Sequence, residues 1–419
     1  MTGRSATVVV IDGLGIGAMP DAGALRIDDA GADTLGALTT WSRRERGREL
    51  RVPWLSRLGL GSVRPDLVGD LSAAAQGKSL EAVGRRSALG YPGADSFAGH
   101  QTLMGADMSH VVLCLLAERI DTVADALRTA GHRVELLDGL PLLVVDGVAL
   151  VHDNLEADPG LNWNVSCRLT DLPFDDIVAI ARIVRSVAPV ARVIAVGGHT
   201  DRPLTEAVRE GADGAVGMDT PASGLYQHDG LEVLHLGADV DHARQLHEVA
   251  AREGIRVTLV GKAADLLVGA SDVRREPAVE TSTIMDAVLE GTGEGLVVAN
   301  VQQTDLAGHS QDPGTYADLL EYVDRRMGEV VARLGPEDLL VVTADHGNDP
   351  SIGHPFHTRE WVPVLACRGD AGIRPDRSAG HELASLADVG AGVGRWLGLP
   401  EVLAVGDPTD LLLTEENPR

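Results

Sequence analysis

The sequence predicts an α/β fold: a mostly parallel sheet flanked by helices, with a smaller α+β domain inserted into it. Continuous apolar runs of strand length recur in both outer parts of the chain and alternate with segments of helical periodicity. Between them, short hairpin-like strands mix with helices. We expect residues 1–108 and 240–419 to form a metal-binding catalytic core. Residues 109–239 are then an inserted cap domain that governs substrate specificity.

The first predicted strand covers residues 7–11, TVVVI, an apolar run typical of a strand buried on both faces. Asp12 ends this strand, and the glycine-rich turn 13–17 follows it. A dinucleotide site is disfavoured, because the full GxGxxG spacing is absent and Pro20 comes soon after. The glycines instead allow the backbone to bend tightly around whatever Asp12 binds.

Ser96 ends a polar loop at the start of a helix that we predict over residues 97–105. Serine at this place is commonly a helix N-cap. Its hydroxyl can also be a nucleophile or a metal ligand, which the positive end of a helix favours. The local pattern leaves both roles open.

The remaining elements follow from the same periodicities. In the cap we predict helices at 120–127 and 174–187, and strands at 134–137, 142–145, 148–151 and 191–196. In the second core segment we predict helices at 243–253 and 315–334, and strands at 255–260, 296–301, 339–343 and 362–366.

Three of the core strands each deliver a carboxylate just beyond their carboxyl ends. These carboxylates are Asp12, Asp305 and Asp345, and three histidines accompany them, His309, His346 and His357. A lone aspartate at a strand end is more often a cap than a ligand. In open α/β sheets, however, ligands bind outside the carboxyl ends of the strands, so all six side chains are expected in one crevice.

Three aspartates in one crevice would repel each other, and bound cations are the simplest remedy. Six or seven ligands exceed what one tetrahedral ion takes, so two divalent ions are expected. Paired ions suit phosphoryl or sulfuryl transfer. The mixed nitrogen and oxygen donors leave manganese, zinc and iron open.

The composition excludes several classes of partner. The formal net charge of −26 argues against nucleic acid and against anionic membrane surfaces. The longest apolar run, residues 111–117, is too short to span a membrane. Three scattered cysteines favour reduced thiols in a cytoplasmic protein. The oligomeric state stays open.

Several motifs together resemble the phosphopentomutase family of the alkaline-phosphatase superfamily. They are VVVIDGLGIGAMPDAG and GADTLG near the start, VGKAADLL at 260–267, and TADHGNDP followed by HTREWVPVL. The resemblance implies an alkaline-phosphatase-like core. It covers both core segments well and the inserted domain weakly.

Carried over by motif, the resemblance implies that Asp305, His309 and His357 hold one metal ion. The other ion would be held by Asp12, Asp345 and His346, with Ser96 as a further ligand. Ser96 falls where the family places a phosphorylated threonine. The loop departs from the family pattern in having Ala94 for a lysine and in lacking a Trp-Glu pair.

The cap departs further, because residues 195–198 read AVGG where the family has an arginine-bearing ARPF segment. Contacts to the substrate phosphate are therefore assigned only to nearby cationic or imidazole side chains. They are His199, Arg202 and Lys262, with Arg209 a further candidate.

We expect an isomerase: a phosphomutase that interconverts positional isomers of a pentose or related sugar phosphate through phosphorylated Ser96. The expected ions are Mn²⁺, with Zn²⁺ as the alternative. A phosphatase or phosphodiesterase on the same core is the second interpretation, and a metal-dependent binding protein without turnover is the third.

Overall fold

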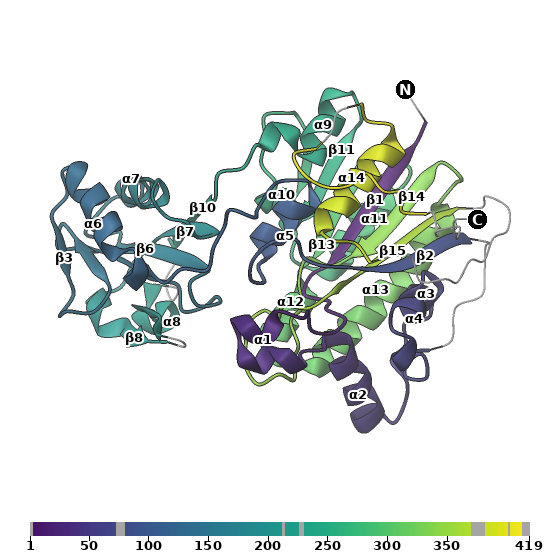
Figure 1. Ribbon diagram of the computed structural model, residues 1–419, viewed down its shortest axis with the longest axis horizontal. Coiled ribbons are helices and arrows are strands. Elements are labelled where there is room, and N and C mark those ends of the chain that lie inside the picture. Colours follow the sequence, from purple (N-terminus) through teal and green to yellow (C-terminus); the bar gives the residue numbers. More distant parts are fainter. Residues whose placement is uncertain are drawn as a thin grey trace. The chain divides into compact units, whose positions relative to one another are not determined.

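The structure is a computed structural model, and it describes residues 3–72, 80–211, 214–225, 230–369, 382–400 and 403–412. The chain forms two compact units (Figure 1). Unit 1 consists of Met1–Met108 and Asp241–Arg419, and unit 2 is Ser109–Val240. Each unit is described by itself.

Unit 1 is built on a seven-stranded sheet in the order β12-β11-β13-β1-β14-β15-β2. Its strands are β1 (Ser5–Ile11), β2 (Leu80–Ser87), β11 (Val257–Gly261), β12 (Arg274–Glu276), β13 (Leu296–Val301), β14 (Asp338–Thr343) and β15 (Val362–Gly369). Only β15 runs against the others, because it pairs antiparallel with both β14 and β2. The predicted α/β class with a mostly parallel sheet is confirmed.

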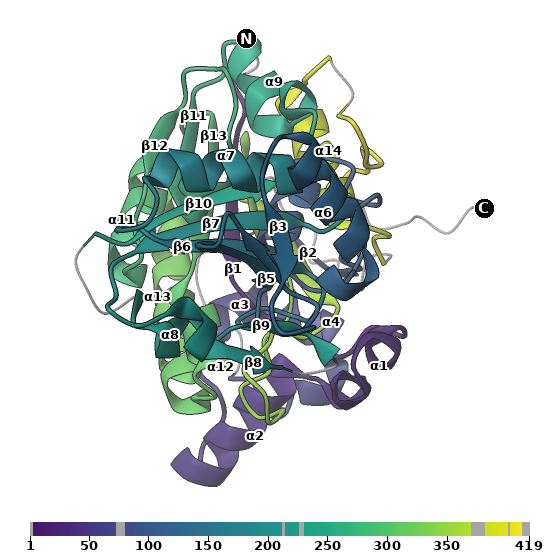
Figure 2. The same cartoon turned by 90° about the vertical axis from the view of Figure 1, so that its left-hand side faces the viewer.

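Helices cover both faces of this sheet, which is why every residue of β1 is buried. The helices of unit 1 are α1 (Ala22–Leu25), α2 (Thr34–Arg46), α3 (Pro53–Arg57), α4 (Leu60–Val63), α5 (Ser96–Leu103), α9 (Leu246–Arg252), α10 (Lys262–Leu266), α11 (Thr281–Gly291), α12 (Gln303–His309), α13 (Pro313–Arg333) and α14 (Leu386–Leu397). Helices α11 and α13 pack on one face, and α14 packs with α5 and α9 on the other (Figure 2).

Unit 2 has a six-stranded sheet in the order β10-β7-β6-β5-β4-β3 and a separate β8-β9 pair. Its elements are α6 (Ile120–Thr129), β3 (Val134–Leu136), β4 (Leu143–Val145), β5 (Ala149–Asp153), β6 (Asn162–Arg168), α7 (Phe174–Arg185), β7 (Arg192–Gly198), β8 (Val208–Glu210), β9 (Val216–Met218), α8 (Thr220–Ser223) and β10 (Glu232–Gly237).

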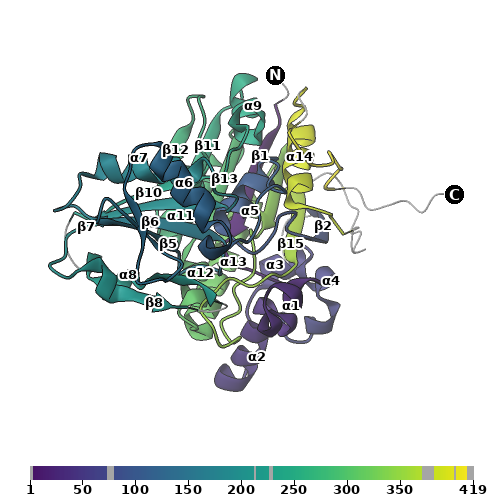
Figure 3. The same ribbon diagram turned by 60° about the vertical axis from the view of Figure 1, so that its left-hand side comes forward.

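Helices α6 and α7 lie on one side of the unit 2 sheet, and α8 and β8 lie on the other (Figure 3). Each face of the sheet carries its own apolar core. One core lies under α6 and α7 and includes the fully buried Trp163, whose indole N–H donates to the Cys114 carbonyl at 2.9 Å. The other lies under β9 and includes Leu150 and Met218. Unit 2 therefore buries its own apolar side chains.

The structure corrects two expectations about elements. The helix predicted at 243–253 is instead a 3₁₀ turn, His242–Arg244, followed by the shorter α9, because Gln245 has an extended backbone. No strand was predicted between residues 196 and 255, yet this part of the chain contains β8, β9 and β10. All three cysteines are free and buried. No helix of the described residues is long and apolar enough to cross a membrane.

Candidate active site

The three predicted aspartates lie at the carboxyl ends of three adjacent strands. Strand β1 pairs in parallel with β13 on one side and with β14 on the other. Asp12 directly follows β1, Asp345 follows β14 by two residues, and Asp305 lies in α12, just after β13. All three carboxylates are buried. Neighbouring parallel strands thus bring together residues that are far apart in the sequence.

Ser96 is the first residue of α5, and its hydroxyl is not used as a helix cap. The N-cap is Asp95, whose carboxylate accepts a hydrogen bond from the Ala98 N–H at 2.9 Å. Of the two roles left open for Ser96, helix capping is therefore taken by Asp95. The Ser96 Oγ lies instead 2.9 Å from His346 Nε2 and 2.9 Å from Lys262 Nζ.

Asp12, Asp345 and His346 form the first group of possible metal ligands. His346 Nε2 lies 3.5 Å from Asp12 Oδ1 and 3.4 Å from Asp345 Oδ2. Neither of these oxygens accepts a hydrogen bond from any described residue. Both are therefore buried acceptors with lone pairs free for a cation.

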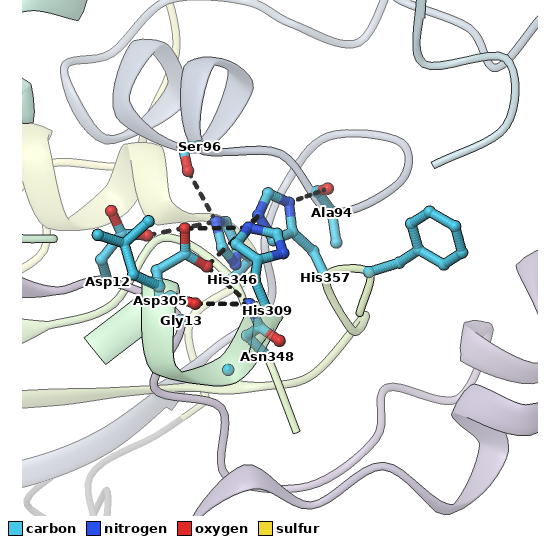
Figure 4. Close-up of polar contacts among 12 residues, drawn as sticks. Asp12, Gly13, Ala94, Ser96, Asp305, His309, His346, Asn348 and His357 are labelled. Carbon is cyan, nitrogen blue, oxygen red and sulfur yellow. Dashed lines mark hydrogen bonds and ion pairs between the residues drawn. The ribbon is translucent and has the colours of Figure 1, made fainter. Parts of the chain in front are cut away.

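Asp305, His309 and His357 lie beside the first group (Figure 4). His309 Nε2 and His357 Nε2 are 3.1 Å apart, and each is within 3.4 Å of an Asp305 oxygen. Asp305 and His357 also group with His346, whose ring stacks on that of His357 at a centroid distance of 3.8 Å. His346 is thus close to both sets of ligands.

Backbone carbonyls fix the tautomers of the three histidines. Nδ1 of His357 faces the Ala94 carbonyl at 3.0 Å, and Nδ1 of His346 faces the Gly347 carbonyl at 3.0 Å. Nδ1 of His309 lies against the Pro355 carbonyl. A carbonyl only accepts, so each Nδ1 carries a proton and each Nε2 is the ring atom that faces the cluster. This is the arrangement that metal-binding imidazoles adopt.

Lys262 lies at the centre of the carboxylates. Its Nζ is 2.6 Å from Asp12 Oδ2 and 3.5 Å from Asp305 Oδ2. Gly261 before it has φ 65° and ψ −141°, and a Cβ there would meet the Asn300 carbonyl oxygen at 2.5 Å. Glycine is therefore needed for the turn from β11 into α10 that points Lys262 at the cluster.

The crowding of charges shifts the acidities in opposite directions. Burial, with Asp345 alongside, raises the pKa of Asp12 to about 7, although Lys262 opposes this. Burial also acts to raise the pKa of Asp305, but Lys262 and His357 overcome it and hold that pKa well below its usual range. Against burial, Asp305 raises the pKa of His309 to about 9. The site thus has more negative charge than Lys262 alone balances.

The donor set fits divalent metal ions. Three carboxylates and three imidazoles with inward-facing Nε2 atoms are ligands that Mn²⁺, Zn²⁺ and Fe²⁺ all accept. Two cations would bind to the free lone pairs of Asp12 and Asp345. Their positive charge would also lower the raised pKa of Asp12.

Other residues around the cluster were not singled out from the sequence. His100 lies one helical turn after Ser96, and its Nδ1 is 2.8 Å from the Ser96 carbonyl and 3.4 Å from Asp345 Oδ2. Asn348 donates to Asp305 Oδ1 at 2.8 Å. Asn348 lies within the quoted motif TADHGNDP, but only contacts between distant segments reveal either role.

The two cap residues predicted to bind substrate, His199 and Arg202, lie in unit 2, just after β7. Both side chains are exposed there. Their role in substrate binding stays a prediction. His354, which lies in the same loop as His357, bonds to Asp29 Oδ1 at 2.9 Å and belongs to neither group of ligands.

Fold and side chains together describe an α/β core with metal ligands gathered around a hydroxyl, and known proteins agree with this class. The chain matches the model of the Metalloenzyme superfamily over residues 4–401. It is 30% identical to a phosphopentomutase of Chromohalobacter salexigens, across 98% of this chain and 97% of that one. It is 32% identical to a phosphopentomutase of Symbiobacterium thermophilum, across 95% and 96%.

The chain therefore belongs to the phosphopentomutase family of the metalloenzyme superfamily, and it is a metal-binding phosphomutase, an isomerase. Among solved structures, a Leishmania mexicana phosphoglycerate mutase matches 94% of this chain and 95% of its own, with 16% identity and a TM-score of 0.44. The fold assignment above depends on the strand order and not on that likeness.

Proposed function

We propose that the protein interconverts the 1- and 5-phosphates of a pentose, or of a closely related sugar, with Ser96 as the residue that carries the phosphoryl group. The observation that carries this proposal is the position of the Ser96 hydroxyl. It is 2.9 Å from the only amine in the cluster of described residues, Lys262, and 2.9 Å from His346. Relatives named phosphopentomutase support the substrate class.

The reaction is balanced without water or a redox partner. The Oγ–P bond of phosphorylated Ser96 breaks while a substrate hydroxyl oxygen bonds to phosphorus and gives up its proton. The resulting bisphosphate turns round in the site. Its other phosphoryl group then returns to Ser96 Oγ, and the oxygen it leaves takes up a proton. The net result moves one phosphoryl group between two positions of the sugar.

The residues of the site stabilise the charge that develops in both transfers. Ser96 Oγ becomes an oxyanion whenever it is the leaving group, and the Lys262 ammonium donates to it. The buried position of Ser96, 6% exposed, limits access of water, which would convert transfer into hydrolysis. Divalent ions held by the two ligand groups, Mn²⁺ in our proposal and Zn²⁺ as the alternative, would supply positive charge against the transferring oxygens.

The test compares Ser96→Ala with the wild type. Metal-loaded protein is incubated with sugar 1-phosphates and 5-phosphates, and ³¹P NMR follows both isomers and free phosphate. Ser96→Ala should lose isomer formation by at least about 1000-fold, because the group that carries the phosphoryl is gone. Its metal content should match that of the wild type.

Ser56→Ala is the matched control, since the Ser56 hydroxyl only bonds to the Val52 carbonyl at 2.8 Å in α3. It should keep full activity. Isomer formation by Ser96→Ala would contradict the role of Ser96. Wild-type protein that releases phosphate and forms no isomer would be a phosphatase instead.

A further inference from the structure

A carboxylate that the proposed mechanism does not use is buried among the loops that carry the metal ligands. The two oxygens of Glu360 accept four hydrogen bonds. Oε2 accepts from the N–H groups of Gly17 at 3.0 Å and Thr34 at 2.9 Å. Oε1 accepts from the hydroxyls of Thr34 at 2.6 Å and Thr358 at 2.7 Å. A fully buried carboxylate is costly without such partners, so the surrounding loops are arranged around it.

Two glycines make room for this side chain. A Cβ on Gly15 would lie 2.2 Å from Glu360 Oε2, and a Cβ on Gly347 would lie 2.5 Å from Oε1. Gly15 belongs to the turn after Asp12, and Gly347 directly follows His346. The carboxylate of Glu360 therefore holds together the two loops that supply the first group of ligands.

The Thr34 hydroxyl extends these contacts toward the second group of ligands. Thr34 Oγ1 donates to Glu360 and accepts from the N–H of Asn348 at 3.1 Å. The Asn348 side chain then donates its Nδ2 to Asp305 Oδ1 at 2.8 Å and to the Asp305 carbonyl at 3.2 Å. The Thr34 hydroxyl thus connects Glu360 to Asn348, which in turn donates to Asp305.

Close packing prevents Asn348 from turning away from Asp305 (Figure 4). A Cβ on Gly13 would lie 3.0 Å from the Asn348 Cβ, and a Cβ on Gly308 would lie 2.4 Å from its Cγ. A rotated amide would also bring Oδ1 against the Asp305 carboxylate, which offers no proton. The hydrogen bond to Asp305 therefore has a fixed direction.

We propose that Glu360 is a positioning residue that orients the Asp305 carboxylate for a metal ion through Thr34 and Asn348. Above the pKa of Glu360, which burial raises to about 7, the carboxylate only accepts, so it directs the hydroxyl hydrogen of Thr34 toward itself. A lone pair of that hydroxyl is then left for the Asn348 N–H. This inference rests on the proposed metal role of Asp305, and it does not depend on which sugar phosphate reacts.

The test measures metal binding rather than turnover. Thr34→Val keeps the shape of the side chain but removes the hydroxyl, and Thr34→Ser restores the hydroxyl. Mn²⁺ is titrated calorimetrically into metal-stripped protein, and thermal unfolding of the metal-free variants is recorded in parallel. Thr34→Val should weaken one Mn²⁺ site by about 10–100-fold, as loss of outer-shell partners usually does, and Thr34→Ser should recover most of it.

Thr39→Val is the matched control on the same helix. The Thr39 hydroxyl is buried and bonds only to the Gly36 carbonyl at 2.9 Å among the described contacts. This variant should lower the Tm of the metal-free protein and leave Mn²⁺ affinity unchanged. If Thr34→Val also lowers only the Tm, the contacts are purely structural and the inference is overturned.

Glu360→Gln tests the inference independently if Thr34→Val does not fold. Glutamine fills the same space, but its NH₂ group faces donors on one side, so the direction of the Thr34 hydroxyl is lost. Mn²⁺ affinity should fall within the same range, and unchanged affinity would overturn the inference. Wild-type protein that binds no divalent ion would contradict the proposed function itself, which is a separate outcome.

Discussion

Lys262 is one of only two lysines in a chain with 62 acidic residues, and its Nζ lies 2.9 Å from Ser96 Oγ. Although burial favours the neutral amine, Asp12 and Asp305 raise the pKa of Lys262 above its usual value. Lys262 is therefore a cation at neutral pH. Its charge offsets part of the carboxylate repulsion and is also available to the Ser96 oxyanion.

Lys262→Met separates these two effects. Catalysis should fall by roughly 100-fold, because a charged donor to the transferring oxygen is lost. Mn²⁺ affinity should stay equal or rise, since a competing cation 2.6 Å from Asp12 has been removed. Steady-state kinetics and calorimetric titration measure the two quantities. Unchanged kcat would show that the contact with Ser96 is incidental.

At the scale of single elements, α13 carries a buried carboxylate, Asp324, that belongs to neither group of candidate ligands. Asp324 Oδ1 accepts from the Leu55 N–H at 2.8 Å, at the start of α3, whereas its Oδ2 has no hydrogen-bond partner among the described residues. Burial raises the pKa of Asp324 to about 7 from 3.8. This carboxyl joins α3 to α13 and is favoured in its protonated form.

The contribution of Asp324 to the stability should therefore fall with rising pH. The unfolded chain releases the Asp324 proton near pH 3.8, whereas the folded protein keeps it to about pH 7. The stabilisation is complete below about pH 4, is lost between about pH 4 and 7, and stays lost above that. Asp324→Asn keeps the acceptor without the charge. It should be nearly neutral at pH 5 and stabilising by roughly 2 kcal/mol at pH 8.

Urea denaturation at the two pH values measures this difference. Asp318→Asn, on the same helix but with a 70% exposed side chain, should change stability by less than about 1 kcal/mol at both. An equal effect of Asp324→Asn at pH 5 and pH 8 would contradict the raised pKa.

Much of the sheet follows directly from the sequence, since the apolar runs at 7–11, 296–301 and 339–343 each correspond to a strand. Strand β2 was not predicted, because its sequence LEAVGRRS has too few apolar residues in a row. The reversed direction of β15 was also not predictable. A run of apolar residues does not reveal whether the strand runs parallel or antiparallel to its neighbours. That direction depends on the path of the loop before the strand.

The site was predictable to the extent that its residues stand next to strand ends. Asp12, Asp345 and His346 are of this kind, and the structure brings them together as expected. Lys262 was predicted only as a phosphate contact, and Thr34 and Asn348 were assigned no role. Their partners lie between 43 and 326 residues away in the chain, so no local pattern marks them.

At the scale of the whole molecule, both groups of metal ligands belong to unit 1, whereas unit 2 has two apolar cores of its own. A ligand that binds only the folded state stabilises it by about 2.7 kcal/mol at 100 times its Kd. Metal removal should therefore destabilise unit 1 selectively.

Differential scanning calorimetry with Mn²⁺ and with EDTA checks this expectation. EDTA should lower the Tm of one transition and leave a second one in place. The isolated fragment 109–240 should unfold cooperatively at the temperature of the second transition, with no response to Mn²⁺. A single transition that shifts as a whole would show that the two units unfold together.

The central place of β1 between β13 and β14 also bears on how the protein is made. Strand β1 is synthesised well before its second partner, which ends only at residue 343. At roughly 5–20 residues per second, about 20–70 s separate the two. During that time unit 2 can fold completely while TVVVI stays unpaired. Nascent chains of this enzyme should therefore depend on chaperones that shield the apolar segment TVVVI until β14 has been synthesised.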